Sequence, residues 1–223
     1  MRNNNTKTMV TLAMTAALAY LLMLVIRIPV FAMPPLKYEP KDVAITIAGF
    51  IFGPVSAFLV SLVVSLVEMV TVSETGWIGA VMNLVSTCSF ACMAAYIYKK
   101  NHTLKGAVIG LVCGIVSMVI VMLLWNYILT PIYMGYPREA VAPMLPTVFL
   151  PFNLLKGVLN AAFVMLLYKP LVIALRKAGL VAPSAAVTTE NAAPHKIRPG
   201  VMLIAAALII TCILIILVLT GKI

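Results

Sequence analysis

One lysine lies inside an apolar stretch long enough to span a membrane, in the phrase Phe152-Asn153-Leu154-Leu155-Lys156-Gly157. Burying an ammonium at that depth costs a few kcal/mol, so such a group faces a polar cavity or a partner. Asn153 lies three residues earlier and therefore shares a helix face with Lys156. The pair predicts a ligand site within a membrane bundle.

A second side-chain amide, Asn126, lies near the end of another apolar run, between Trp125 and Tyr127. An amide both donates and accepts hydrogen bonds, whereas an ammonium only donates. Asn126, Asn153 and Lys156 together suit the carbonyl and ring-nitrogen edge of a planar heterocycle. The alternative is a polar clamp between helices that binds no ligand.

Glu68 is the carboxylate that lies well inside an apolar run. It could pair with Lys156, line the cavity, carry a proton, or reach water by snorkelling from two turns below the helix end. Asn83 and Asn160 are weaker candidates, because each could instead form a hydrogen bond between helices.

The densest polar cluster between apolar runs is Leu36-Lys37-Tyr38-Glu39-Pro40-Lys41-Asp42. We interpret it as a lid over a binding site, with an ordinary solvated loop as the alternative. Asp42 is expected to cap the helix that follows.

The first apolar segment carries small residues at helical spacing. Ala13 and Ala17 are four apart, and Ala16 and Ala19 broaden the smooth face. Small residues at this spacing let a second helix approach closely, in a partner or within the same bundle.

Composition restricts the class of protein. The chain is 63% hydrophobic and 10% charged, which indicates an all-α integral membrane protein. The net charge of +10 falls mainly in short loops, so we expect membrane topology and not nucleic acid to explain it. The sequence has no Walker A, His-Glu-x-x-His or Gly-x-Ser-x-Gly motif and only two histidines. We therefore expect binding and transport, with no catalytic residues and no cofactor.

The four cysteines lie in apolar segments. Cys88 and Cys92 are four apart, a spacing that could suit a metal, but no histidine or carboxylate lies near enough in sequence to complete a site. We interpret all four as apolar packing residues and expect no metal.

The apolar runs predict seven helices. A domain over residues 1–178 holds six of them, residues 179–199 form a flexible linker, and residues 200–223 hold one further membrane helix. If the N-terminus is cytoplasmic, the cytoplasmic segments hold more basic residues than the outer segments do, which favours this orientation. Seven spans would then place the C-terminus outside the cell membrane. The expected helices cover residues 8–26, 42–52, 55–72, 77–98, 104–129, 147–175 and 201–219.

Several short sequence segments, taken in their order along the chain, resemble one family. The chain resembles the riboflavin-binding S components of energy-coupling factor (ECF) vitamin transporters. The resemblance rests on residues 36–42 followed by Gly49-Phe50-Ile51-Phe52-Gly53-Pro54, then on Asn126-Tyr127-Ile128 with Pro131-Ile132-Tyr133, and on the run from Pro151 to Lys156. It covers most of residues 8–178.

The resemblance implies a six-helix bundle whose pocket near the outer face takes riboflavin, with FMN or analogues as further candidates. It implies that Asn126, Asn153 and Lys156 bind the isoalloxazine edge and that Leu36, Lys37 and Tyr38 help to enclose it. Ala13 and Ala17 would meet a transmembrane coupling subunit, and two cytoplasmic ATPases would supply energy. The bundle would topple in the membrane to release its vitamin inside.

Two features depart from that family pattern: the helix after residue 200, and the charges of Glu39 and Lys41 in the loop. The competing hypothesis is a stand-alone, proton-coupled secondary transporter of a flavin or other heterocyclic nutrient, with Glu68 as the proton carrier. A membrane enzyme or an assembly protein is a third, for which the sequence offers no catalytic constellation.

Overall fold

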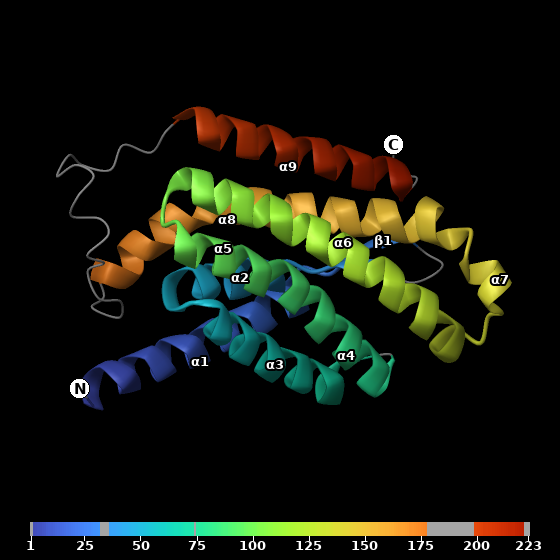
Figure 1. Ribbon diagram of the computed structural model, residues 1–223, viewed down its shortest axis with the longest axis horizontal. Coiled ribbons are helices and arrows are strands. Elements are labelled where there is room, and N and C mark those ends of the chain that lie inside the picture. The colour runs from blue at the N-terminus through green and yellow to red at the C-terminus, as the bar shows by residue number, and fades with distance from the viewer. Residues whose placement is uncertain (1, 32–35, 74, 178–198, 221–223) are drawn as a thin grey trace.

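A computed structural model describes residues 2–31, 36–73, 75–177 and 199–220. Helices make up nearly all of it, and a two-stranded hairpin lies at one end (Figure 1). The elements in chain order are α1 (Arg2–Val25), β1 (Ile28–Phe31), β2 (Leu36–Tyr38), α2 (Lys41–Phe52), α3 (Pro54–Thr71), α4 (Gly76–Thr87), the π-helical turn η1 (Cys88–Cys92), α5 (Met93–Lys100), α6 (Leu104–Met134), α7 (Arg138–Val141), the π-helical turn η2 (Leu145–Phe149), α8 (Leu150–Lys177) and α9 (Pro199–Leu219).

Successive long helices run in opposite directions along the bundle (Figure 1). We call the end at which α1 and α3 finish and α4 and α8 begin the pocket end. The hairpin and α7 lie there, whereas α1 begins at the opposite end. Helix α9 runs back along α8 and finishes at the pocket end (Figure 1). The predicted linker, residues 179–199, lies almost wholly outside the described residues.

The expected all-α membrane fold, six bundle helices and one more, is confirmed. Six described stretches are long and apolar enough to span a membrane. Helix α2 of the bundle is too short to span: its 12 residues extend only about 18 Å, whereas the hydrocarbon core is about 30 Å thick. Residues 41–50 of α2 are all buried, so α2 fills the centre of the bundle and its side chains face other helices.

Small residues let the central helices approach closely. A β-carbon on Gly110 of α6 would lie 2.7 Å from the carbonyl oxygen of Ala94, and one on Gly114 would lie 2.7 Å from that of Phe90. Gly49 of α2 is similarly constrained, because a β-carbon at this position would lie 2.9 Å from the β-carbon of Ala95. These contacts seat α2 and α6 against the η1–α5 segment, as small residues do in membrane bundles.

Some expected boundaries were wrong. The segment after α1 was predicted as a loop, but Ile28 pairs with Tyr38 and Pro29 with Lys37 in an antiparallel hairpin. Helix α6 continues to Met134 instead of ending at residue 129, so Pro131 lies inside the helix although it cannot donate a backbone hydrogen bond there. Gly135, with φ of 68°, then ends α6 in the left-handed conformation typical of helix C-termini.

The predicted capping role of Asp42 was also wrong. Pro40 occupies the N-cap of α2, and Asp42 lies inside the first turn, fully buried. Its carboxylate accepts hydrogen bonds from Thr87 and Asn160 of other helices, so it joins the bundle core instead of terminating its own helix.

Candidate functional site

A pocket lies at the pocket end, between the hairpin and helices α3, α4, α6 and α8. Seven of the eight predicted ligand-binding residues line it. They are Leu36, Lys37, Glu68, Asn83, Asn126, Asn153 and Lys156. Residues separated by more than a hundred positions in the sequence therefore meet around one space.

The eighth predicted residue, Tyr38, lies behind the pocket wall. Its ring is buried in an apolar cluster with Val30, Phe152 and Leu155, and its hydroxyl donates to Oδ1 of Asn160 at 3.0 Å. Burial, helped by the charge of Asp42, raises the pKa of the Tyr38 phenol, so the hydroxyl stays protonated and able to donate.

Sequence reasoning missed several residues of the pocket wall, including Arg27, Ser86, Met122, Phe149 and Phe152. Charges just beyond a helix end look like solvated loop residues, and apolar side chains in a span carry no distinguishing signal. The scarcity of acidic residues was a usable signal, since the chain has only six and Glu39, Asp42 and Glu68 are close in sequence.

Lys156 is paired. Its Nζ lies 3.1 Å from Oδ2 of Asp42 and 3.4 Å from Oγ of Ser86. The side chain is 8% exposed and that of Asp42 is 0% exposed. An ammonium has three N–H donors, so the two contacts leave donor capacity on the pocket side. The sequence suggested Glu68 as a partner of Lys156, but in the structure the partner is Asp42.

Asp42 is a junction between three elements. Its Oδ1 accepts from Oγ1 of Thr87 at 2.7 Å, and its Oδ2 accepts from Nδ2 of Asn160 at 3.2 Å as well as from Lys156. Asn160 in turn accepts from Tyr38, so the hairpin is connected to Lys156 through two buried side chains. Asn160 thus serves as an inter-helix hydrogen-bonding residue.

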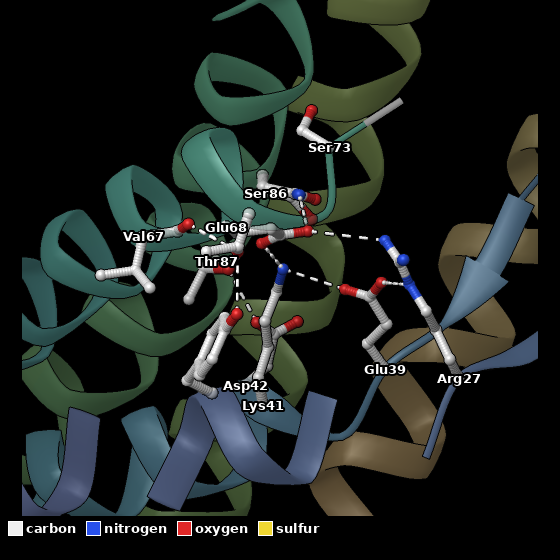
Figure 2. A network of polar contacts seen from close by, with 12 residues as sticks. Arg27, Glu39, Lys41, Asp42, Val67, Glu68, Ser73, Ser86 and Thr87 are labelled. Carbon is white, nitrogen blue, oxygen red and sulfur yellow. Dashed lines mark hydrogen bonds and ion pairs between the residues drawn. The ribbon is translucent and has the colours of Figure 1, made fainter. Parts of the chain in front are cut away.

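A second ionic cluster lies between the hairpin and α3. Figure 2 shows the ammonium of Lys41 between the carboxylates of Glu39 and Glu68. Nζ of Lys41 is 2.9 Å from Oε2 of Glu39 and also bonds Oε2 of Glu68. Nε of Arg27 is 2.8 Å from Oε1 of Glu39, and its Nη2 is 4.0 Å from Oε1 of Glu68. Lys41 is therefore a buried ion-pair residue and not a loop charge.

Glu68 lines the pocket but does not pair with Lys156. Nδ2 of Asn83 donates to its Oε1 at 2.8 Å, and Lys41 occupies its other oxygen. The glutamate is 3% exposed, so it does not reach water by snorkelling. Any proton-carrying role would require release of this carboxylate from Lys41.

The two amides are held in the same way. Nδ2 of Asn126 donates to the carbonyl oxygen of Met122 at 2.7 Å, and Nδ2 of Asn153 donates to that of Phe149 at 2.8 Å. Each contact runs to the carbonyl four residues earlier in the same stretch of chain, so these bonds do not join α6 to α8. The second amide hydrogen and the oxygen lone pairs leave both side chains capable of binding a ligand.

Ion pairs surround the pocket. Three cations, Arg27, Lys41 and Lys156, face three carboxylates, Glu39, Asp42 and Glu68, and a fourth cation, Lys37, also lines the pocket. Burial of Glu39 opposes its ionisation, but the neighbouring Lys41 and Arg27 outweigh this and hold the pKa of that carboxyl below its usual value. The wall therefore offers directed donors and acceptors held in place by ion pairs.

Helix α1 presents the predicted small residues on two different faces. Ala13 and Ala17 are exposed, whereas Ala16 and Ala19 are buried in the bundle core. The four alanines thus do not form one smooth surface. The exposed pair stays available to another helix, and the buried pair packs internally.

The protein-family comparison decides what kind of molecule carries this pocket. The sequence model of the family described as "ECF transporter, substrate-specific component" matches residues 7–168. The chain belongs to this family. The resemblance identified from the sequence phrases is thereby confirmed, and this substrate-specific component is a multi-pass membrane protein. Helix α9 lies beyond the matched residues.

Two characterised relatives of this substrate-specific component are riboflavin transporters. The riboflavin transporter RibU of Staphylococcus aureus is 32% identical over 172 residues, which cover 74% of this chain and 90% of that protein. The riboflavin transporter FmnP of Bacillus subtilis is 27% identical over 172 residues, covering 73% and 90%. Both are transporters and not enzymes.

A solved structure supports the same fold. It is described as "Structure and mechanism of the S component of a bacterial ECF transporter". It superposes with a TM-score of 0.67 at 30% identity and covers 77% of this chain and 99% of that one.

Proposed function

We propose that this substrate-specific component captures riboflavin in the pocket and delivers it to the cytoplasm as part of an ECF-type importer. The observation that carries the proposal is the convergence of Asn126, Asn153 and Lys156 on one pocket in a chain whose relatives are riboflavin transporters. Amides and an ammonium match the carbonyl and nitrogen edge of the isoalloxazine ring. Leu36 and Lys37 of the hairpin enclose the ligand, and Glu68 and Asn83 line its far side.

The proposed function also requires a defined orientation in the membrane and partner subunits. The pocket end faces outward and the N-terminus lies in the cytoplasm, in keeping with the basic residues at the N-terminal end. Ala13 and Ala17 meet the transmembrane coupling subunit, beside an apolar groove that Met14 and Leu18 help to line. Two cytoplasmic ATPases drive the reorientation of the bundle that releases riboflavin.

Full-length protein purified from flavin-rich cells is expected to be yellow, with roughly stoichiometric riboflavin. Stripped protein is expected to quench the fluorescence of added riboflavin. The Lys156→Met variant serves for comparison: it removes one pocket donor and is expected to bind riboflavin more weakly than the native protein. A colourless preparation that leaves riboflavin fluorescence unchanged contradicts the proposal.

A further inference from the structure

Asp42 is a buried acid that the binding proposal leaves without a role. It is 0% exposed and lies behind Lys156, outside the residues that line the pocket. Its three partners, Thr87, Asn160 and Lys156, all donate to it. A carboxylate accepts all three, whereas an amide in its place would set its own N–H groups against one of the donors.

The position of Lys156 depends on this carboxylate. A lysine side chain has four rotatable methylenes, and only Asp42 and Ser86 hold its ammonium among the described residues. The contact to Ser86 is the longer of the two, at 3.4 Å against 3.1 Å. Thr87 and Asn160 in turn fix the carboxylate from two other helices.

We propose that Asp42 is a positioning residue: it aims the ammonium of Lys156 at the bound ligand without touching the ligand itself. The proposal rests on the proposed riboflavin site. Its distinguishing consequence is that Asp42 affects binding only when Lys156 is present.

A double-mutant cycle on the full-length protein tests this dependence, with riboflavin affinity measured by fluorescence quenching. Asp42→Asn is expected to weaken binding about 10- to 100-fold in the native background. In the Lys156→Met background the same change is expected to alter affinity less than about threefold. The visible absorption band of bound riboflavin, which responds to charge beside the ring, is expected to shift with Asp42→Asn only when Lys156 is present.

Asp42→Glu provides a second variant, since it keeps the charge and moves it by one methylene. It is expected to weaken binding in the native background and not in the Lys156→Met background. Equal losses in both backgrounds would assign Asp42 a purely structural role. Failure of the native protein to bind riboflavin would instead overturn the proposed function.

A second inference concerns α9, the helix beyond the family match. Its buried residues, Ala205, Cys212 and Ile216, form one stripe at helical spacing. Cys212 and Ile216 belong to the same apolar cluster as Val30 and Tyr38 of the hairpin. Much of the rest of α9, such as Ile210 and Leu214, is exposed and suited to lipid.

This contact places α9 against the back of the pocket wall. The hairpin carries Leu36 and Lys37 on the pocket side, and its Val30 and Tyr38 pack toward α9 and the start of α8. A helix used only as an anchor would need no seat on a binding element. We infer that α9 braces the hairpin against the pocket and so slows the exchange of ligand.

The test compares riboflavin release from two full-length variants by recovery of fluorescence after dilution. Ile216→Ser removes a buried contact, and release is expected to be about fivefold faster. Ile213→Ser, on the exposed face of the same helix, is the matched control and is expected to release at nearly the native rate. The Cys212→Ser/Ile216→Ser double variant is expected to be faster still; native release from it would show that α9 does not brace the hairpin.

Discussion

Replacing Lys41 with methionine is expected to lower the free energy of unfolding by about 3–5 kcal/mol. Methionine nearly matches the lysine side chain in length, so packing changes little. The change leaves the carboxylates of Glu39 and Glu68 facing each other, buried, without the cation between them. Arg27 reaches Glu39 but lies at 4.0 Å from Glu68, so it compensates only in part. Unfolding by SDS, followed by circular dichroism, measures the loss.

Lys105→Met is the matched control, because Lys105 is an exposed residue near the start of α6. It is expected to change the unfolding free energy by less than about 0.5 kcal/mol. Adding Glu68→Gln to Lys41→Met removes one of the two uncompensated charges, so it should recover part of the loss. If Lys41→Met were as stable as Lys105→Met, the cluster would contribute nothing to folding.

The helices could be predicted because a membrane span has a length requirement that the sequence displays directly. Runs of apolar residues broken by prolines and charges located all seven helical segments, five of them within three residues at both ends. The hairpin could not be found in the same way. Its strands are three and four residues long and include Pro29, so neither β-propensity nor alternation could identify them.

The pocket was predictable to the extent that polar residues are costly inside a span. Asn126, Asn153, Lys156 and Glu68 were identified for this reason, and all four line the pocket. The pairing among the charges was not predictable, because Asp42 in the first turn of a helix has an ordinary explanation as a cap. Only the packing of α2 at the bundle centre brings it to Lys156.

Replacing Ala17 with tryptophan is expected to abolish riboflavin uptake by cells while leaving riboflavin affinity of the purified protein within about twofold. Ala17 is exposed on α1 and lies outside the pocket lining, so the indole obstructs only what approaches α1 from outside the chain. Close helix approach depends on small residues, and an indole prevents it. Radiolabelled uptake and fluorescence quenching supply the two measurements.

Val112→Trp is the control for a tryptophan at a lipid-facing position, because Val112 on α6 is 53% exposed. It is expected to preserve both uptake and binding. Uptake retained in Ala17→Trp would place the coupling surface elsewhere or remove the need for a coupling subunit. In the second case, uptake would survive loss of the cellular ATPases, and Glu68→Gln would abolish it while sparing binding. The contacts of Glu68 argue for the opposite result, because Lys41 and Asn83 engage both of its carboxylate oxygens and tie it to the structure of the bundle.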